Sequence, residues 1–262
     1  MTLNLIILGL FTGVITGMTG ASGVMMVVPV LTTFFDQPLR AVLGTSLLVD
    51  VIASASVAYM FWRNRHVDFK SGVWLLVGSL LGAQLGSIYV VSVSRLIIFA
   101  ALALGMIFFG LIMWRTGVLH HKPKVLTLPN RWLEYLQTPI WLIIIGVLIG
   151  LSTGIFGAGG GVVIFIVLFS ILQLPVKTAI GTSTFIMFLT ALSGVVGYFE
   201  NGNLDLRAGM IIGVAAAFGG IFSSVIANRI RDDVLAKLIG AFFIFLALVM
   251  FLLKVVLPLL GY

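Results

Sequence analysis

Long apolar stretches recur along the chain, and short polar segments separate them. They occupy residues 47–62, 73–91, 96–114, 140–155 and 238–253, with almost no charged side chain inside. Each approaches the roughly 20 residues that a helix needs to cross a hydrocarbon layer of about 30 Å. The stretches show no strict alternation of polar and apolar positions, and backbone groups must be paired in lipid. We therefore predict membrane helices and not barrel strands.

The composition agrees with a membrane location. Of the 262 residues, 61% are hydrophobic and 9% are charged, against about 45–50% and about 25% in soluble domains. The formal net charge of +7 comes from Lys and Arg in the polar segments. There they orient helices, so we expect the lipid bilayer as a partner and no nucleic acid. The chain has no cysteine, which excludes disulfides and thiolate chemistry. Residues 1–10 lack a basic region and a cleavage site, so we expect them to begin the first helix.

The sequence repeats itself with a shift of 137 residues. This shift aligns the Gly-Thr-Ser triplet at 44–46 with the one at 181–183, and the register holds without a gap for over seventy residues. Other aligned pairs are Gly9 and Gly146, Gly13 and Gly150, Gly17 and Gly154, Gly20 and Gly157, Pro38 and Pro175, and Asp68 and Asp205. We predict two membrane repeats, 1–114 and 138–262, joined by a polar, proline-broken cytoplasmic linker at 115–137.

Each half opens with a stretch that is too long for one straight span. Residues 3–35 and 140–172 would each be roughly 50 Å long as a single helix, and glycines interrupt both. Two arrangements are open. A long tilted span gives four crossings per half and parallel repeats, whereas a helical hairpin that enters and leaves on one side gives inverted repeats.

The distribution of Lys and Arg distinguishes the two arrangements. Parallel repeats divide these residues nine against six between the two faces, and inverted repeats divide them eleven against four. The four are Arg40, Arg95, Arg207 and Lys254. The positive-inside rule favours inversion. We predict an all-α polytopic membrane protein with two inverted repeats, each a broken helix or hairpin followed by three transmembrane helices. We place it in the cytoplasmic membrane with both termini outside.

The glycine clusters that break the opening stretches are candidate binding elements. A helix that restarts after such a break presents free N–H groups and a partial positive charge, which can hold an anion without a lysine. The alternative is close packing of helices by small residues, and we expect that role for Gly9, Gly13 and Gly17. The predicted substrate-binding residues of the two clusters are Gly20, Ala21, Ser22, Gly23, Gly157, Ala158, Gly159, Gly160 and Gly161.

Hydroxyl and amide side chains near these breaks could complete the coordination of an anion. Thr45 and Ser46 recur as Thr182 and Ser183 near the start of the next helix in each half. Their hydroxyl groups can equally bond to the carbonyl four residues earlier in their own helix. Gln84 is a further candidate, which either faces the same cavity or bridges helices.

Asp50 is the only acidic residue inside a predicted span. A carboxyl group within the membrane is costly, so we consider it a candidate carrier of a coupling proton. Its counterpart in the second half is Met187, and a protonated Asp50 could instead serve to bind a neighbouring helix. The three histidines show no metal-ligand spacing, and no nucleotide-binding motif is present, so we predict no metal and no cofactor.

These residues resemble the sulfite exporter TauE/SafE family, also called the TSUP permeases. The resemblance rests on the glycine run from Gly9 through Gly23, on its second copy ending at Gly161, and on Arg40 or Lys177 preceding each Gly-Thr-Ser triplet by four residues. The basic loop at residues 63–68 also carries it. The resemblance implies movement of sulfur-containing organic and inorganic anions across the cytoplasmic membrane. In the first half, Ser22 and Val24 stand in place of two glycines of the family's triple-glycine run.

We therefore expect a secondary transporter of sulfite or a small organosulfur anion, with its site at the midplane between the repeats. An intramembrane enzyme would need clustered acid, base or metal groups at span depth, and Asp50 alone is no such set, so we predict no enzyme. The alternatives that stay open are an anion channel and a membrane scaffold without transport.

Overall fold

The computed structural model describes residues 2–252 except 21, 23, 36, 89–103, 105–106, 109, 112–113, 116–129 and 157–159. Within these residues the regular elements are all helices, which confirms the predicted all-α class. The chain forms two compact units: Met1–Val90 with Thr127–Arg229, and Val91–Leu126 with Ile230–Tyr262. The first unit contains helices from both sequence halves, because helices of one half pack on those of the other. The division into repeats at 114 and 138 concerns the sequence and stays a prediction.

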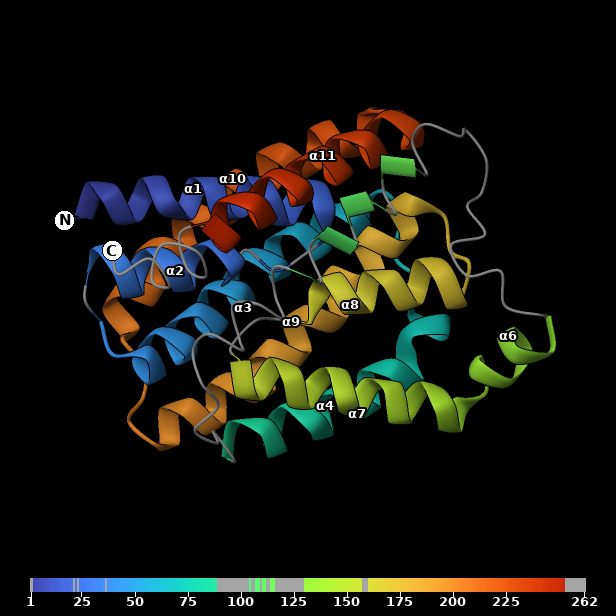
Figure 1. Cartoon of the computed structure of the whole chain (residues 1–262), viewed down its shortest axis with the longest axis horizontal. Coiled ribbons are helices and arrows are strands. Elements are labelled where there is room, and N and C mark those ends of the chain that lie inside the picture. The colour runs from blue at the N-terminus through green and yellow to red at the C-terminus, as the bar shows by residue number, and fades with distance from the viewer. Residues whose placement is uncertain are drawn as a thin grey trace. The chain divides into compact units, whose positions relative to one another are not determined.

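The helix boundaries of the first unit repeat with the sequence (Figure 1). The first half forms α1 (Thr2–Thr19), α2 (Val24–Phe34), α3 (Leu39–Arg63) and α4 (Phe69–Ile88). The second forms α6 (Asn130–Leu136), α7 (Pro139–Phe156), α8 (Gly161–Ile166), the π-helix η1 (Val167–Ile171), α9 (Val176–Glu200) and α10 (Leu206–Arg229). A shift of 137 takes both ends of α1 onto α7, of α3 onto α9, and of α2 onto α8 with η1. Proline precedes both α3 and α9, where a missing N–H costs nothing.

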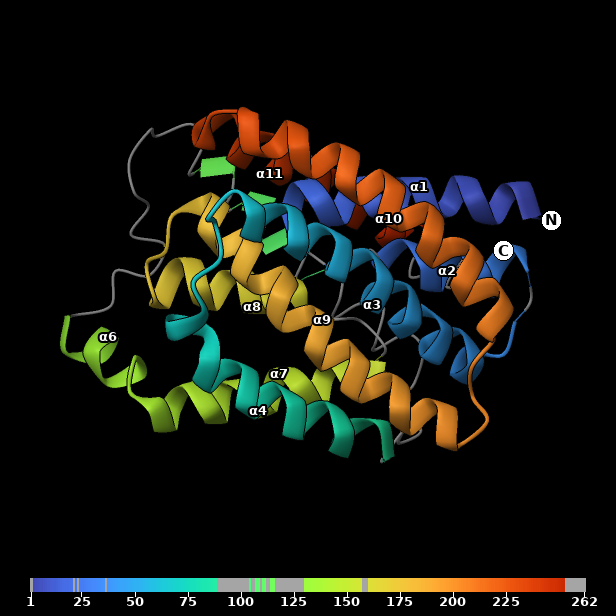
Figure 2. The ribbon, with the colours of Figure 1, turned by 180° about the vertical axis from the view of Figure 1, so that it is seen from behind.

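The helices of the first unit pack in a symmetric order. α3 and α9 lie at the centre, α10 packs on α3 with α1 outside it, and α4 packs on α9 with α7 outside it (Figure 2). α2 lies against α3, and α8 against α9. Each of these helix pairs therefore has a counterpart in which the two halves exchange places.

Contacts between residues give the helix directions. α1, α3 and α10 run parallel, since Gly9 meets Ile212 and Gly17 meets Gly220, while Leu48 meets Gly209 and Val57 meets Gly220. α4 and α7 also run parallel, from the contacts Gly78 with Ile143 and Gly86 with Leu151. α9 runs parallel to α4, since Gly72 meets Thr182 and Ser87 meets Gly197. α3 and α9 are antiparallel, because Gly44 meets Tyr198 and Gly181 meets Phe61. Repeat-equivalent helices thus run in opposite directions within the unit, which favours inverted repeats as the membrane topology, our continuing prediction.

Glycines bring the outer helices into close contact. A methyl group on Gly13 would overlap the carbonyl oxygen of Ala216 in α10, and one on Gly150 would overlap that of Ser79 in α4. Small residues at such spacing let helix backbones approach each other in a membrane. The packing role that we expected for Gly9, Gly13 and Gly17 is confirmed, since all three lie against backbone atoms of α10.

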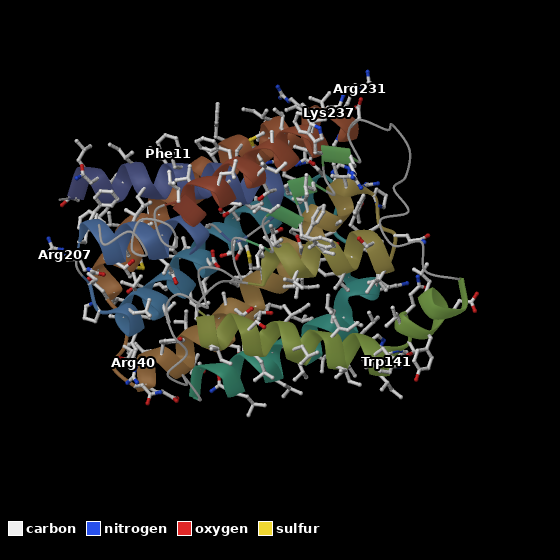
Figure 3. The ribbon with its side chains drawn as sticks, in the orientation of Figure 1. Phe11, Arg40, Trp141, Arg207, Arg231 and Lys237 are labelled. Carbon is white, nitrogen blue, oxygen red and sulfur yellow. The ribbon has the colours of Figure 1, made fainter. Side chains whose placement is uncertain are left out.

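Four described helices are long and apolar enough to cross a membrane: α1, α3, α9 and α10. Arg40 and Arg207 lie at the end of the unit that also holds the start of α1, whereas Trp141 lies at the other end (Figure 3). The helix directions place Arg63, Lys70, Lys177 and Arg229 at that other end as well. The inverted arrangement assigns these two groups of Lys and Arg to opposite membrane faces, and in the folded unit they lie at opposite ends.

The second unit is described mainly by α11 (Asp232–Phe251). Within it, Gly110 lies against the backbone of Gly240, which again is a contact between small residues. Arg231 forms an ion pair with Asp233 at the start of α11, with 3.2 Å between Nε and Oδ1. The predicted linker at 115–137 lies largely outside the described residues.

Candidate functional site

Both opening stretches break at their glycine clusters. α1 ends at Thr19, Gly20 follows with a φ of +67°, and α2 begins at Val24. The positive φ suits glycine, which lacks the Cβ that would clash there. The second stretch ends α7 at Phe156 and begins α8 at Gly161. The predicted breaks are confirmed. Ala21, Gly23, Gly157, Ala158 and Gly159 lie outside the described residues.

The tips of the two broken stretches meet inside the first unit. A methyl group on Gly161 would lie 2.9 Å from the Gly20 carbonyl oxygen, 3.0 Å from the Ser22 amide nitrogen and 2.5 Å from the Met187 sulfur. Glycine at this position therefore lets the start of α8 touch the first tip. Residues of both halves contribute to one small region, which we call the tip junction: Gly20, Ser22, Asp50, Gly160, Gly161, Ser183 and Met187.

Asp50 lies at the midpoint of α3 and is fully buried. The Ser22 hydroxyl of the first tip donates a hydrogen bond to Asp50 Oδ2. The Ser54 hydroxyl, one turn further along α3, donates to the Asp50 backbone carbonyl. The carboxyl group of Asp50 is thus joined to the element that breaks the first stretch. Met187 occupies the equivalent midpoint of α9.

Ser183 also reaches the first tip. Its hydroxyl lies 3.2 Å from the Gly20 carbonyl oxygen and 2.9 Å from the Ile180 carbonyl oxygen of its own helix. The side chain is fully buried. A hydroxyl of the second half therefore contacts the break of the first half. Of the predicted hydroxyls, Ser183 and Ser22 are the two that the structure brings to the tip junction.

Thr45 and Thr182 point to connecting loops at opposite ends of the unit. Each Oγ1 accepts a hydrogen bond of 2.9 Å from a loop amide of the other half, Thr45 from Asp205 and Thr182 from Asp68. The preceding glycines, Gly44 and Gly181, lie against carbonyl oxygens of the same two loops. The repeated triplet thus ties each half to the other. The Ser46 hydroxyl donates to the Leu43 carbonyl 2.7 Å away.

Gln84 lies on the face of α4 that packs against α9. Its Oε1 is 3.4 Å from the Ser193 hydroxyl, about 9 Å along α9 from Met187 at 1.5 Å per residue. The described contacts of Gln84 are therefore those of a residue that bridges two helices, the alternative weighed for it above.

Thr153 is part of the second tip and is not among the site residues predicted from the sequence. Its Oγ1 accepts the Gly160 N–H at 2.9 Å and donates to the Ile149 carbonyl at 2.9 Å. Its equivalent in the first half is Thr16, whose backbone carbonyl accepts the Gly20 N–H at 2.9 Å. The repeat pairs these two threonines, and that pairing was the available signal.

The tip junction is poor in charge. α1 and α2 carry no charged residue, and those of α9 and α10 are confined to their end turns. His66 lies at the basic end of the unit, where its Nδ1 is 2.7 Å from Asn228 Oδ1. Across the described positions there is no group of three His, Cys, Asp or Glu residues that could hold a metal. Hydroxyl groups, backbone amides and one carboxyl group are therefore the chemistry that the junction offers.

The model of the family described as Sulfite exporter TauE/SafE matches residues 5–250. The probable membrane transporter protein YdhB of Bacillus subtilis (strain 168) is 33% identical over 208 residues, covering 77% of this chain and 80% of that protein. The probable membrane transporter protein YunE of the same organism is 24% identical over 253 residues, covering 89% and 91%.

A third relative comes from another organism. The probable membrane transporter protein MJ0441 of Methanocaldococcus jannaschii is 32% identical over 117 residues, covering 42% of this chain and 44% of that protein. No solved structure matches the chain. All three relatives are named as transporters. The match extends over nearly all of the sequence, including both tips and the central pair of helices, and this chain therefore belongs to the sulfite exporter TauE/SafE family.

Proposed function

We propose that this protein is a secondary transporter that carries sulfite or a small organosulfur anion across the cytoplasmic membrane. The observation that carries the proposal is the tip junction, where two helix breaks from equivalent half-sequences meet beside the midpoints of α3 and α9. Broken helices that meet near the middle of the membrane are the recurring binding plan of transporters built from inverted repeats. The family's name and the names of the relatives support this class of function.

The donor set of the junction favours a small anion of low charge. Ser22 and Ser183 offer hydroxyl donors, and the helix breaks leave backbone N–H groups near the same place. Hydroxyl and amide donors bind anions without the strong attraction that a buried Lys or Arg would add. A carrier must also release its cargo, so moderate attraction suits transport. A sulfonate or a sulfite ion fits this description.

Asp50 is the residue that we propose as carrier of a coupling proton. A charged carboxylate beside the bound anion would repel it, and the low-polarity surroundings strengthen that repulsion. Protonation of Asp50 removes the repulsion, so proton and anion would be taken up together. Ionisable groups at membrane depth commonly mark such proton pathways.

Uptake by the purified protein in liposomes tests the proposal. We expect saturable uptake of labelled sulfite and of small sulfonates that follows an imposed pH gradient. In Asp50→Asn the dependence on the gradient should disappear. If correctly folded protein takes up no such anion, the substrate assignment is wrong. Passage at rates far beyond a carrier's turnover would instead identify a channel.

The proposed orientation places the N-terminus and the Arg40 and Arg207 end outside, and the C-terminus outside as well. Because the chain has no cysteine, single cysteines can report the side of each loop. Arg207→Cys should react with a membrane-impermeant thiol reagent in intact cells, and Arg63→Cys should react only after the membrane is opened. The reverse labelling pattern would overturn the proposed orientation.

A further inference from the structure

The hydrogen bond between Ser22 and Asp50 joins a residue of the first tip to the only acid that lies away from the ends of the described membrane helices of the first unit. A serine hydroxyl has one proton to donate, whereas an ionised carboxylate can only accept. When Asp50 is charged, the Ser22 proton is therefore directed to Asp50 Oδ2, as the structure has it. When Asp50 is protonated, its own O–H can donate to Ser22 Oγ, and the Ser22 proton can turn toward another acceptor.

We infer that Ser22 is a substrate-binding residue whose hydroxyl is available to the anion only when Asp50 is protonated. Ser22 then couples the two binding events: it donates to Asp50 in the empty, deprotonated state and to the substrate anion in the protonated state. This inference rests on the proposed function and adds the residue that transmits the protonation state. The step moves one proton from solution to the Asp50 carboxylate, and no covalent bond to the substrate forms or breaks.

The surroundings of Asp50 make it the group that titrates. Four helices pack around α3: α1, α2, α9 and α10. α1 and α2 contribute no charged residue, α9 contributes Lys177 and Glu200 in its first and last turns, and α10 contributes Arg207 and Arg229 in its end turns. These four side chains belong to the ends of the unit, while Asp50 lies at the midpoint of α3. Among the residues that the structure describes, a change of charge near Ser22 therefore comes from Asp50.

The two halves differ at the positions of Ser22 and Asp50, and this difference suggests a substitution that tests the inference. The residue equivalent to Ser22 is Gly159, and the residue equivalent to Asp50 is Met187. Ser22→Gly thus introduces the residue that the second half uses in its own copy of the cluster. It removes the hydroxyl and adds no bulk at a position that is 1% exposed.

The test is equilibrium binding of methanesulfonate to the purified full-length protein from about pH 5 to about pH 9. A sulfonate keeps its single negative charge over this range, whereas sulfite changes its own protonation. For the natural protein we expect the dissociation constant to rise about tenfold per pH unit above the point where Asp50 loses its proton, because one proton binds with each anion.

Three variants distinguish the role of Ser22 from that of Asp50. Asp50→Asn should bind at all pH values as the natural protein does at low pH, because the amide can donate to Ser22 Oγ permanently. Ser22→Gly should bind at least about tenfold more weakly at low pH, the loss of one hydrogen bond to a charged group, while Ser22→Thr should keep both affinity and pH dependence. Ser79→Ala is the matched control, since it removes a buried hydroxyl that bonds Thr190, 2.7 Å away, between α4 and α9; its pH dependence should be unchanged.

Each outcome has one reading. If Ser22→Gly binds as tightly as the natural protein at low pH, the inference is wrong while the proposed function stands. If Asp50→Asn keeps the natural pH dependence, the inference and the proposed role of Asp50 as proton carrier are both wrong, while the proposal of anion transport stands. If Ser22→Gly does not fold, Ser22→Ala takes its place. Loss of affinity in Ser22→Ala, with Ser22→Thr still binding, supports the inference. Equal binding by the natural protein, Ser22→Ala and Ser22→Thr overturns it. If the folded natural protein binds neither methanesulfonate nor sulfite at any pH, the proposed function itself fails.

Discussion

The first and second tips share a framework and differ in their chemistry. α1 and α7 have the same length, both pack through glycines on a helix of the other half, and a proline-led helix follows each broken stretch. At the midpoint of α3 stands Asp50, bonded to Ser22, whereas at the midpoint of α9 the sulfur of Met187 lies close to Gly161. The duplicated features build the junction, and the unduplicated acid gives one half alone a group that can change its charge.

Substitutions in the shared framework should cause the largest loss of stability. We expect Gly13→Ala and Gly150→Ala each to destabilise the protein by about 3 kcal/mol or more, because the added methyl group meets backbone oxygen atoms that cannot move aside. Thermal unfolding in detergent and the yield of monodisperse protein measure the effect. Similar losses in both variants would support the equivalence of the two frameworks.

Gly202→Ala serves as the control for this prediction. Gly202 has a φ of +67°, and a methyl group there would meet nothing within 4 Å. The cost should be the conformational one of about 1 kcal/mol. If Gly13→Ala were tolerated as well as Gly202→Ala, the close packing of α1 on α10 would be wrong.

The sequence predicted this framework well because its signals are local or repeated. Glycine spacing, the prolines before α3 and α9, and the 137-residue shift together predicted the breaks and the paired helices. The sequence could not predict which residues of the two halves contact each other. It does not say that Thr45 meets the Asp205 loop or that Ser183 meets Gly20. Such contacts follow from packing between halves. The role of Thr45 and Thr182 in anion binding stays a prediction, although their described bonds are to loops.

Exchanging the residue types at positions 50 and 187 tests the difference between the two halves. Met187→Asp should destabilise the protein by about 3 kcal/mol or more, because it buries a carboxyl group at a fully buried position beside Gly161, with no serine equivalent to Ser22. Asp50→Met should keep the fold, because it removes the cost of burying a carboxyl group, but should abolish proton-coupled uptake. Unfolding curves and liposome uptake measure the two effects.

Met187→Leu is the control for the exchange, with an expected cost below about 1.5 kcal/mol. A Met187→Asp protein as stable as this control would mean that the second tip accommodates an acid as the first one does. The asymmetry of the junction would then carry no consequence for stability.

A smaller and equal effect is expected at the two Gly-Thr-Ser triplets. Thr45→Val and Thr182→Val each remove the acceptor of one loop amide, at about 1–2 kcal/mol. Because the two loops lie at opposite ends of the unit, the double variant should show the sum of the single effects. Thermal unfolding of the three proteins checks this, with Thr45→Ser and Thr182→Ser as controls that keep the hydroxyl. Markedly unequal losses would contradict the symmetric role of the triplets.

The smallest effect concerns the loop aspartates that cap α4 and α10. Asp68 Oδ1 accepts the amides of Lys70 and Ser71, and Oδ2 accepts the Ser71 hydroxyl; Asp205 Oδ1 accepts the Ala208 amide at 2.9 Å. Partial burial opposes ionisation of Asp68, yet the hydrogen bonds from Ser71 and Lys70 and the nearby Lys70 charge keep its pKa below the usual value.

A lowered pKa in the folded state means that the unfolded chain binds the proton more readily. The stabilisation by Asp68 is therefore fully present above about pH 4, the usual pKa of an aspartate, and is lost as the pH falls through the lower folded value. Asp68→Ala should cost about 1 kcal/mol at neutral pH, and the difference from the natural protein should shrink in acid. Thermal unfolding at about pH 7 and about pH 3 measures this difference. A difference that grows in acid would contradict the assigned hydrogen bonds, because protonation of Asp68 can only reduce the stabilisation that its ionised carboxylate provides.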